Sequence, residues 1–310
     1  MKVLVTGGAG FIGGALTKRL VEKGDSVTCL VRDRRGIAKL SKLGVKIAAG
    51  DISDPEIEKY FKGMDMVFNC AATLAYHNQP DREFWKTNVV GVRNLLEISL
   101  RNKVRLFTHL SSVAVFNPKD IYSRTKLEGE KLVGRYKKKG LKTIVVRPTI
   151  AYGPGDTRPG FLEFFKLSKI GIVPVVGGGN NFFHTIYIGN LIDAIVFLAG
   201  SSKAAGGGFV IGDKPCPKMK GVIGAIMKAV GCKLSVNVPL FIAYPAAYFF
   251  GLVKVFGVKV PLSLGRVKFL TEERKYDLSQ IERLGFAPKV DLESGMRETY
   301  SWYRKKGYIA

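Results

Sequence analysis

The sequence has little cysteine and little histidine, and each shortage excludes a class of protein. It contains four cysteines in 310 residues, none of them in a CxxC pair: Cys29, Cys70, Cys216 and Cys232. This spacing argues against a disulfide scaffold. No secretory leader precedes the first apolar run, and both observations favour a reducing cytoplasm. Because there are only three histidines as well, we expect no metal site.

Acidic residues are also scarce. Lysine and arginine number 49 against 25 aspartates and glutamates, which gives a formal net charge of +24. Such an excess attracts anions, including phosphorylated ligands, acidic membrane surfaces and nucleic acid, although a solvated lysine-rich surface is the simpler interpretation. The chain has no zinc-finger spacing and no RNA-binding aromatic signature, so we predict no specific nucleic-acid partner.

Long hydrophobic runs are nearly absent. One apolar stretch without a charged residue, 235–253, has 19 positions and is interrupted by Pro239 and Pro245. Because a membrane-spanning helix needs about 20 apolar residues, two other interpretations are favoured. Either this stretch covers an apolar substrate pocket, or residues 235–268 contact a membrane peripherally. Basic residues beside the stretch would attract anionic lipid, namely Lys254, Lys259, Arg266 and Lys268.

Glycine is abundant at the start of the chain, in "MKVLVTGGAGFIGG". An apolar run typical of a strand is followed by three glycines, Gly7, Gly10 and Gly13. A helical pattern begins at Phe11 and Ile12, before the third glycine, and a second strand pattern follows it. In such a βαβ unit the first glycine permits a tight turn, the second admits a phosphate, and the third lets helix and strand pack closely. The pattern therefore predicts a dinucleotide whose pyrophosphate meets the helix N-terminus.

The end of the second strand helps to choose the dinucleotide. An NAD site usually has a carboxylate there, but this chain reads "CLVRDRRG", with Arg32 directly after the last apolar residue. A guanidinium can bind the 2′-phosphate of NADP in a bidentate way. We therefore favour NADP(H) as the cofactor. NAD(H) stays possible through Asp33, with Arg34 and Arg35 close by.

Apolar strand patterns alternate with helical patterns up to about residue 150, which predicts an α/β fold. The repeated strand–helix units favour a Rossmann-type, doubly wound parallel sheet. We expect residues 1–150 to form the dinucleotide-binding core and residues 151–310 to form mostly a smaller, C-terminal substrate-binding lobe. Within that second half, segments at about 180–200 are expected to return to the core.

The stretch "HLSSVAVFNPKDIYSRTKLEGE" carries the predicted chemistry. Tyr122 and Lys126 are four apart at the start of a helix and so share one face. A nearby ammonium favours ionisation of a tyrosine, which could then act as general acid or base near neutral pH. Ser112, at the end of the preceding strand, is placed to orient the substrate oxygen. These three residues are the predicted catalytic set.

The chain resembles the extended short-chain dehydrogenases/reductases, also called the NAD-dependent epimerase/dehydratase family. The motifs that carry this resemblance include "TGGAGFIG", "AAGDISD", "VFNCAA", "LSSVAVF", "YSRTK" and "VVRPTIAYGPGD". The resemblance implies that Ser112, Tyr122 and Lys126 form the catalytic trio, with Ser111 as an adjacent alternative to the serine. It also implies four sets of cofactor contacts. Asp51 and Ile52 would lie beside the adenine, and Ala71 and Ala72 along the cofactor groove. Asn88 would support the active site, and Pro148, Thr149 and Ile150 would pass the nicotinamide.

Two reactions fit this resemblance. The "LVRDRRG" stretch and the C-terminal half resemble the 3β-hydroxysteroid dehydrogenase and dihydroflavonol reductase-like branch, which implies hydride transfer between NADP and a secondary alcohol or ketone on an apolar, steroid- or isoprenoid-like substrate. The alternative is a nucleotide-sugar 4-epimerase that holds NAD tightly. A dehydratase is disfavoured, because Ser111, Ser112 and Val113 stand where sugar dehydratases have an acid pair.

Further expectations concern the substrate and the assembly. Only ten positions separate Ser112 from Tyr122, a shorter connection than family enzymes usually have, so the substrate side is expected to be more open. The resemblance also implies a homodimer that pairs through the helices near residues 84–101 and 122–139. Three residues of the second half are candidates to line the substrate site: His184, Tyr187 and Arg266.

Overall fold

The chain divides into two compact units, each assembled from separate segments. The computed structural model describes residues 1–32, 36–74, 79–254 and 263–310. Unit 1 comprises Met1–Thr149, Leu191–Ile211 and Leu278–Ala287. Unit 2 comprises Ile150–Asn190, Gly212–Asp277 and Pro288–Ala310.

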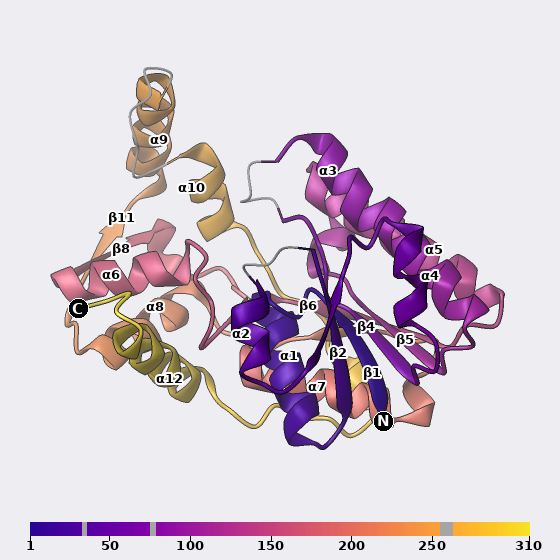
Figure 1. Cartoon of the computed structure of the whole chain (residues 1–310). Helices are drawn as coiled ribbons and strands as arrows, with labels where there is room; N and C mark the ends of the chain where they lie inside the picture. The colour runs from indigo at the N-terminus through magenta and orange to yellow at the C-terminus, as the bar shows by residue number, and fades with distance from the viewer. Residues whose placement is uncertain (33–35, 75–78, 255–262) are drawn as a thin grey trace. The chain divides into compact units, whose positions relative to one another are not determined.

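A seven-stranded parallel sheet forms the centre of unit 1 (Figure 1). Its strands run in the order β10-β6-β5-β4-β1-β2-β3, and every neighbouring pair is parallel. The order 3-2-1-4-5-6 within it is that of a doubly wound dinucleotide-binding sheet, so the predicted Rossmann-type fold is confirmed. The strands are β1 (Lys2–Thr6), β2 (Ser26–Val31), β3 (Lys46–Ala49), β4 (Met66–Asn69), β5 (Leu106–Leu110), β6 (Thr143–Pro148) and β10 (Gly208–Ile211).

Helices cover both faces of this sheet. Helices α4 and α5 pack together on one face, and α1 and α7 lie side by side on the other, where Arg19 pairs with Asp193 (Figure 1). The α-helices of unit 1 are α1 (Phe11–Glu22), α2 (Ile37–Ser41), α3 (Asp81–Trp85), α4 (Val92–Arg101), α5 (Ile121–Lys138), α11 (Ser279–Glu282) and most of α7 (Ile188–Gly200). Shorter turns are η2 (Pro55–Tyr60), the π-helical η4 (Lys86–Gly91), η5 (Val113–Phe116) and η7 (Ser202–Ala204).

Local chemistry explains why α5 begins where it does. The Asp120 side chain accepts a hydrogen bond from the Ser123 N–H, and the Ser123 hydroxyl lies 3.1 Å from the Asp120 N–H, which completes a capping box. Basic side chains in the last turn complement the helix dipole. The helix buries its sheet-facing side in a core that includes Phe107 from β5 and Leu95 from α4. Capping and packing together therefore fix the start and the rotation of the helix that carries Tyr122 and Lys126.

Unit 2 contains two short parallel strand pairs and a set of helices. β7 pairs with β9, and β8 pairs with β11. Helix α8 packs against α12 and α6, and Phe165 lies 5.9 Å from the Tyr300 ring, stacked on it. The elements are β7 (Ile150–Tyr152), α6 (Phe161–Ile170), β8 (Ile172–Val176), η6 (Gly177–Gly179), β9 (Thr185–Tyr187), α8 (Met219–Val230), β11 (Leu234–Val238), α9 (Leu240–Lys254), α10 (Leu264–Thr271) and α12 (Leu292–Lys305).

The charge-free stretch 235–253 is divided between two elements. Its first residues belong to β11, and the remainder forms most of α9, which contains Pro245. None of the helices within the described ranges combines the length and the apolar character needed to cross a bilayer.

Candidate active site

The glycine turn after β1 is held by close backbone packing. Gly7 has a φ of +68°, and its carbonyl accepts a hydrogen bond of 2.9 Å from the Gly10 N–H. A Cβ atom on Gly13 would lie 2.2 Å from the Gly7 oxygen, and one on Gly7 would lie 2.8 Å from the Ala71 nitrogen. Any side chain at either position would therefore displace backbone. The structure gives Gly7 and Gly13 packing reasons that match those expected of a dinucleotide-binding turn.

Gly10 differs, because it is exposed and has more room. A Cβ there would meet only the Gly7 oxygen, at 3.2 Å, among the described atoms. Gly10 is also the N-cap of α1, has no side chain to bond the first turn, and is followed by no acidic residue in that turn. The positive end of the helix dipole is therefore not neutralised by the helix's own side chains. This cradle, with Phe11 and Ile12 half-buried behind it, fits a pyrophosphate.

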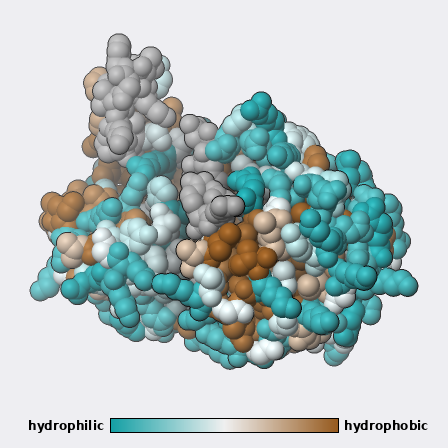
Figure 2. All heavy atoms as spheres, in the orientation of Figure 1, coloured by the Kyte–Doolittle hydropathy of each residue, from teal (hydrophilic) through white to brown (hydrophobic). Residues whose placement is uncertain are grey.

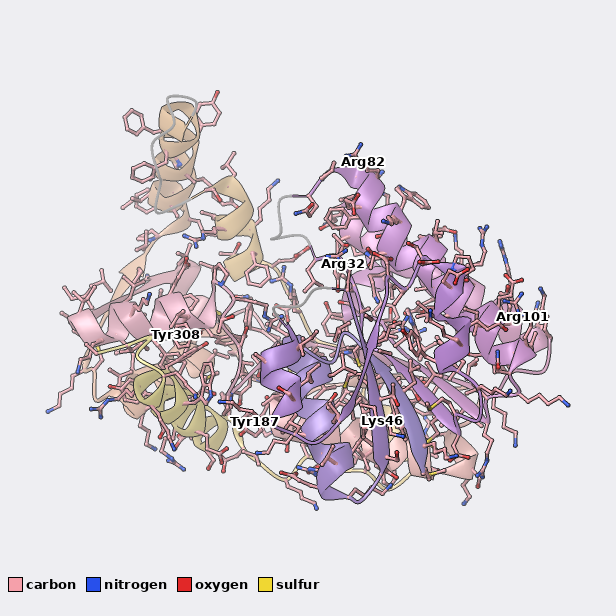
Figure 3. All side chains as sticks on the ribbon, in the orientation of Figure 1. Arg32, Lys46, Arg82, Arg101, Tyr187 and Tyr308 are labelled. Atoms are coloured by element: carbon pink, nitrogen blue, oxygen red, sulfur yellow. The ribbon has the colours of Figure 1, made fainter. Side chains whose placement is uncertain are left out.

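Two cations flank a carboxylate at the ends of β2 and β3. Asp51 accepts hydrogen bonds from the Ser53 N–H at 2.9 Å and from its hydroxyl at 2.7 Å. One Asp51 oxygen lies 3.9 Å from an Arg32 nitrogen and 3.9 Å from the Lys86 Nζ. Burial alone would raise the pKa of Asp51, but the Ser53 hydrogen bonds and the two cations lower it overall. The Arg32 side chain is 65% exposed and is labelled in Figure 3.

The sequence prediction named Arg32 and Asp51 but not Lys86. Lys86 lies in η4, more than 30 positions after Asp51, so only the fold brings the two together. Two cations with one carboxylate between them leave a surplus positive charge, which suits a phosphate better than a neutral ribose hydroxyl. Asp33, Arg34 and Arg35 lie outside the described residues. Ile52, next to Asp51, is buried.

Asn88 joins two segments beneath the predicted active site. It is buried in the π-helical η4. Its carboxamide oxygen accepts a hydrogen bond of 2.9 Å from the Thr73 N–H. Its carboxamide nitrogen donates to the Thr73 carbonyl and to the Thr125 hydroxyl, both at 3.1 Å. Thr73 follows Ala71 and Ala72, which are half-buried after β4. Asn88 thus ties this segment to α5, beside Lys126. Single π turns within helices often mark functional sites.

Lys126 is a buried cation on α5. Its side chain is among the largest fully enclosed ones, with 2% of the residue exposed, and its Nζ donates to the Leu110 carbonyl at 2.6 Å. Burial lowers the pKa of Lys126 from its ordinary 10.5 to about 8, against an opposing effect of the Glu130 carboxylate one turn further on. Tyr122, one turn earlier on the same helix face, is half-buried. A buried amine with a depressed pKa beside a tyrosine is the kind of group found at functional sites.

Hydroxyl groups gather at the ends of β5 and β6. Ser112 is half-buried and its oxygen accepts from the Ala114 N–H at 3.2 Å, which caps η5. The hydroxyls of Ser111 and Thr149 are buried and have no hydrogen-bond partner among the described residues. Pro148 is the last, buried residue of β6, and Ile150 begins β7 in unit 2. Buried polar groups without partners suggest a ligand or water at this edge of the sheet.

A buried polar chain connects three neighbouring strands, and sequence reasoning missed it. The Ala71 N–H donates to the Thr6 hydroxyl at 3.2 Å, and that hydroxyl donates to the Asn69 oxygen at 2.7 Å. The Asn69 nitrogen lies 3.1 Å from His109 Nδ1 and must donate to it, because the Asn69 oxygen is the Thr6 acceptor. Burial, together with Lys126 and Arg147, holds the pKa of His109 well below its usual value.

The three side chains lie at or next to the carboxyl ends of neighbouring strands, and each is a polar residue in a mostly apolar run. That is the signal that could have identified them: a threonine ending "KVLVT", an asparagine ending "MVFN" and a histidine within "LFTHL". His109 is neutral and carries its proton on Nε2, so it adds no positive charge beside Lys126.

The three candidates of unit 2 are each engaged with partners of their own unit. His184 Nε2 bonds to the Asp213 carbonyl at 2.9 Å, and its Nδ1 accepts from the Tyr276 N–H at 3.3 Å. Tyr187 is buried and its hydroxyl donates to Glu298, which together raise its pKa (Figure 3). Arg266 pairs with Glu163. These contacts account for the three side chains without a substrate. No group of three potential metal ligands occurs in the described ranges.

Comparison with known proteins identifies the family. Residues 3–212 match the model of the NAD dependent epimerase/dehydratase family. The chain belongs to this family. Membership confirms the predicted resemblance and supports a nicotinamide dinucleotide as the cofactor. A curated relative, 3beta-hydroxysteroid-dehydrogenase/decarboxylase isoform 1 of Arabidopsis thaliana, is 27% identical over 96% of this chain and 78% of its own length.

Other relatives and solved structures agree with this placement. The 2-alkyl-3-oxoalkanoate reductase of Stenotrophomonas maltophilia is 28% identical over 96% of this chain and 98% of its own length. Among solved structures, UDP-glucose 4-epimerase from Thermotoga maritima, with UDP-glucose, has a TM-score of 0.80 and 23% identity, and covers 99% of both chains. UDP-glucuronic acid 4-epimerase from Bacillus cereus, in complex with NAD, has a TM-score of 0.79 at 21% identity, with 99% of both chains covered. At these identities the structural likeness establishes the fold alone.

Proposed function

We propose that this protein is an NADPH-dependent oxidoreductase that interconverts an apolar ketone and its secondary alcohol. The observation that carries the proposal is Lys126, a buried amine with a depressed pKa one helical turn from Tyr122, in the same unit as a glycine cradle for a dinucleotide. The names of relatives point the same way, because they include a 3β-hydroxysteroid dehydrogenase and an alkyl-oxoalkanoate reductase.

The chain's own residues fit the cofactor, because an exposed glycine cradle, a surplus of positive charge and two unpartnered hydroxyls all lie in unit 1. We infer that the glycine turn holds the pyrophosphate, that Asp51 and Ile52 border the adenine, and that Arg32 and Lys86 bind a 2′-phosphate. The remaining proposed contacts run along the groove to the nicotinamide: Ala71, Ala72, Asn88, Tyr122, Lys126, Pro148, Thr149 and Ile150. When bound, the nicotinamide supplies or accepts the hydride.

Three side chains would manage the proton. In the reducing direction Tyr122 donates its phenolic proton to the carbonyl oxygen, so that hydride and proton together convert the ketone to the alcohol. Lys126 favours the resulting phenolate through its charge. Ser112 orients the substrate oxygen by a hydrogen bond, with Ser111 as the neighbouring alternative. In the oxidising direction Tyr122 accepts the proton instead.

The finer parts of the proposal concern cofactor choice and assembly. The arginine–lysine pair beside Asp51 supports NADP over NAD, because a phosphate would use the surplus positive charge. We propose a homodimer that pairs through α4 and α5, a cytoplasmic location, and a peripheral membrane contact through residues 235–268. These assignments extend the sequence-based predictions.

Two measurements test the proposed activity. The purified protein is denatured and the released dinucleotide identified, and the native protein is assayed for NADPH oxidation with a panel of sterol and long-chain ketones. The proposal predicts an exchangeable site that accepts NADPH, and turnover that depends on Tyr122. Stoichiometric release of NAD, with interconversion of UDP-sugars and no net NADPH consumption, would instead identify a nucleotide-sugar 4-epimerase.

A further inference from the structure

Helix α9 packs on unit 2 through its small residues and exposes its large ones. Ala243 and Ala247, one turn apart, are fully buried and form a small apolar cluster with Val176 and Val267. Six large side chains of the same helix are exposed, and Phe250 is half-buried; the six are Leu240, Phe241, Ile242, Tyr244, Tyr248 and Phe249. An ordinary surface helix turns its large apolar residues toward the core, so the arrangement in α9 is reversed.

The exposed aromatic residues occupy one side of the helix. At about 100° per residue, Phe241, Tyr248 and Phe249 lie on the side away from the two buried alanines, and Tyr244 lies at the margin of that side. We call these four residues the α9 face. Phe241 is 76% exposed, and Tyr248 and Phe249 are each 63% exposed. Figure 1 shows α9 projecting from the elements of its own unit, and side chains of the helix point outward in Figure 3. Aromatic residues clustered in this way are typical of interaction surfaces.

The length of α9 limits how it could meet a bilayer. Its 15 residues extend about 22 Å at 1.5 Å per residue, which is short of the roughly 30 Å hydrocarbon thickness. The part of α9 that the structure describes could therefore lie in the interface but is too short to span the membrane. Phenylalanine and tyrosine suit this position, because their rings enter the acyl boundary while tyrosine hydroxyls remain among the headgroups.

Charge around the helix favours one kind of bilayer. The segment from residue 214 to residue 271, which contains α9, has nine lysines and arginines and no aspartate or glutamate. Lys233 before the helix and Lys268 after it are exposed. Figure 2 also shows hydrophobic surface gathered around the end of α6 and the start of β8, in the same unit. Basic side chains around an apolar helix add attraction to anionic lipid headgroups.

We propose that the α9 face docks unit 2 on an anionic lipid bilayer. The aromatic rings insert at the headgroup boundary, the alanine side stays packed on the protein, and the surrounding lysines contact anionic headgroups. This inference specifies the surface and the lipid chemistry of the membrane contact predicted from sequence. It does not rest on the proposed reductase activity.

The test is co-sedimentation of the full chain with vesicles of phosphatidylcholine and phosphatidylserine, compared with vesicles of phosphatidylcholine alone. The unaltered protein should bind the anionic vesicles, and raised salt should weaken the binding. The triple change Phe241→Ser, Tyr248→Ser and Phe249→Ser should reduce binding at least tenfold with an unchanged unfolding temperature. Phe241→Leu should retain binding, and so should the matched control Trp85→Ser, which removes an exposed aromatic ring from unit 1.

Hydrogen–deuterium exchange on the unaltered chain gives a second readout, which does not depend on whether a variant folds correctly. Amides of α9 should become more protected when the anionic vesicles are added. The proposal is overturned if the unaltered protein ignores these vesicles, or if the triple variant binds them equally well. Loss of a dimer in the triple variant without loss of vesicle binding would assign the face to a second copy. Tyr122→Phe should bind vesicles normally, which separates this inference from the enzymatic one.

Discussion

Replacing Lys126 by methionine tests whether its burial serves stability or function. Methionine keeps the length and apolar stem of the side chain but removes the charge. Because the pKa of the buried amine falls from 10.5 to about 8, the folded state disfavours its charged form. A depressed pKa contributes stability that is complete above pH 10.5 and is lost as the pH falls through 8.

The magnitude follows from the two pKa values. Their difference of about 2.5 corresponds to about 3 kcal/mol at 1.36 kcal/mol per pH unit. Between pH 7 and about pH 10 the unaltered protein should therefore gain about 2–3 kcal/mol of unfolding free energy from this residue alone. Methionine also loses the hydrogen bond to the Leu110 carbonyl, which costs about 1–3 kcal/mol at every pH. That cost cancels when the pH dependence of the two proteins is compared.

The assay is urea unfolding of both proteins at the two pH values, in the absence of cofactor. Near neutral pH we expect Lys126→Met to have about the same unfolding free energy as the unaltered protein, or a higher one. At alkaline pH it should be less stable than the unaltered protein, and it should be inactive at both pH values. Groups that do not interact with Lys126 titrate alike in both chains and drop out of the comparison. The reasoning is refuted if the two proteins show the same change in unfolding free energy between the two pH values.

Four further substitutions test the site. Tyr122→Phe should leave NADPH binding intact, measured by fluorescence titration, and lower turnover by about 10² or more, and undiminished turnover would exclude Tyr122 as the proton donor. Gly10→Ala should weaken dinucleotide binding at an unchanged unfolding temperature, because only the Gly7 oxygen lies near the new methyl group. Gly13→Ala, by contrast, should destabilise the fold by about 1–3 kcal/mol or more. Equal unfolding temperatures for the two variants would contradict the packing argument. Arg32→Ala should raise the Kd for NADPH about tenfold and leave that for NADH unchanged, and a matching loss for both would show that Arg32 does not select the phosphate.

Features set by local sequence could be predicted. The glycine turn follows from the spacing of three residues next to an apolar strand, and the Tyr122–Lys126 pairing follows from helical geometry four residues apart. The strand and helix alternation determined the fold class, because consecutive βαβ units permit few arrangements. The family resemblance was confirmed by a family match over residues 3–212.

Features that depend on contacts between residues distant in the sequence could not be predicted. Lys86 meets Asp51 only because η4 lies beside the end of β3, and the Thr6–Asn69–His109 chain joins residues up to about a hundred positions apart. A single polar residue in an apolar strand shows that a partner must exist but does not say which one. Nothing in the sequence indicated that residues 278–287 group with unit 1. The substrate candidates of unit 2 rested on residue type alone, and the structure adds the partner that each of them contacts within that unit.

The most direct test of the account follows the hydride itself. NADPH carrying deuterium at both positions of the reactive nicotinamide carbon is incubated with the protein and an apolar ketone, and the products are analysed by mass spectrometry. The account predicts one deuterium on the carbinol carbon of the alcohol, an equimolar amount of NADP that keeps the other, and turnover at least about 10²-fold slower with Tyr122→Phe. NADPH that keeps both deuterium atoms across the ketone panel, or alcohol that forms without label, would contradict it.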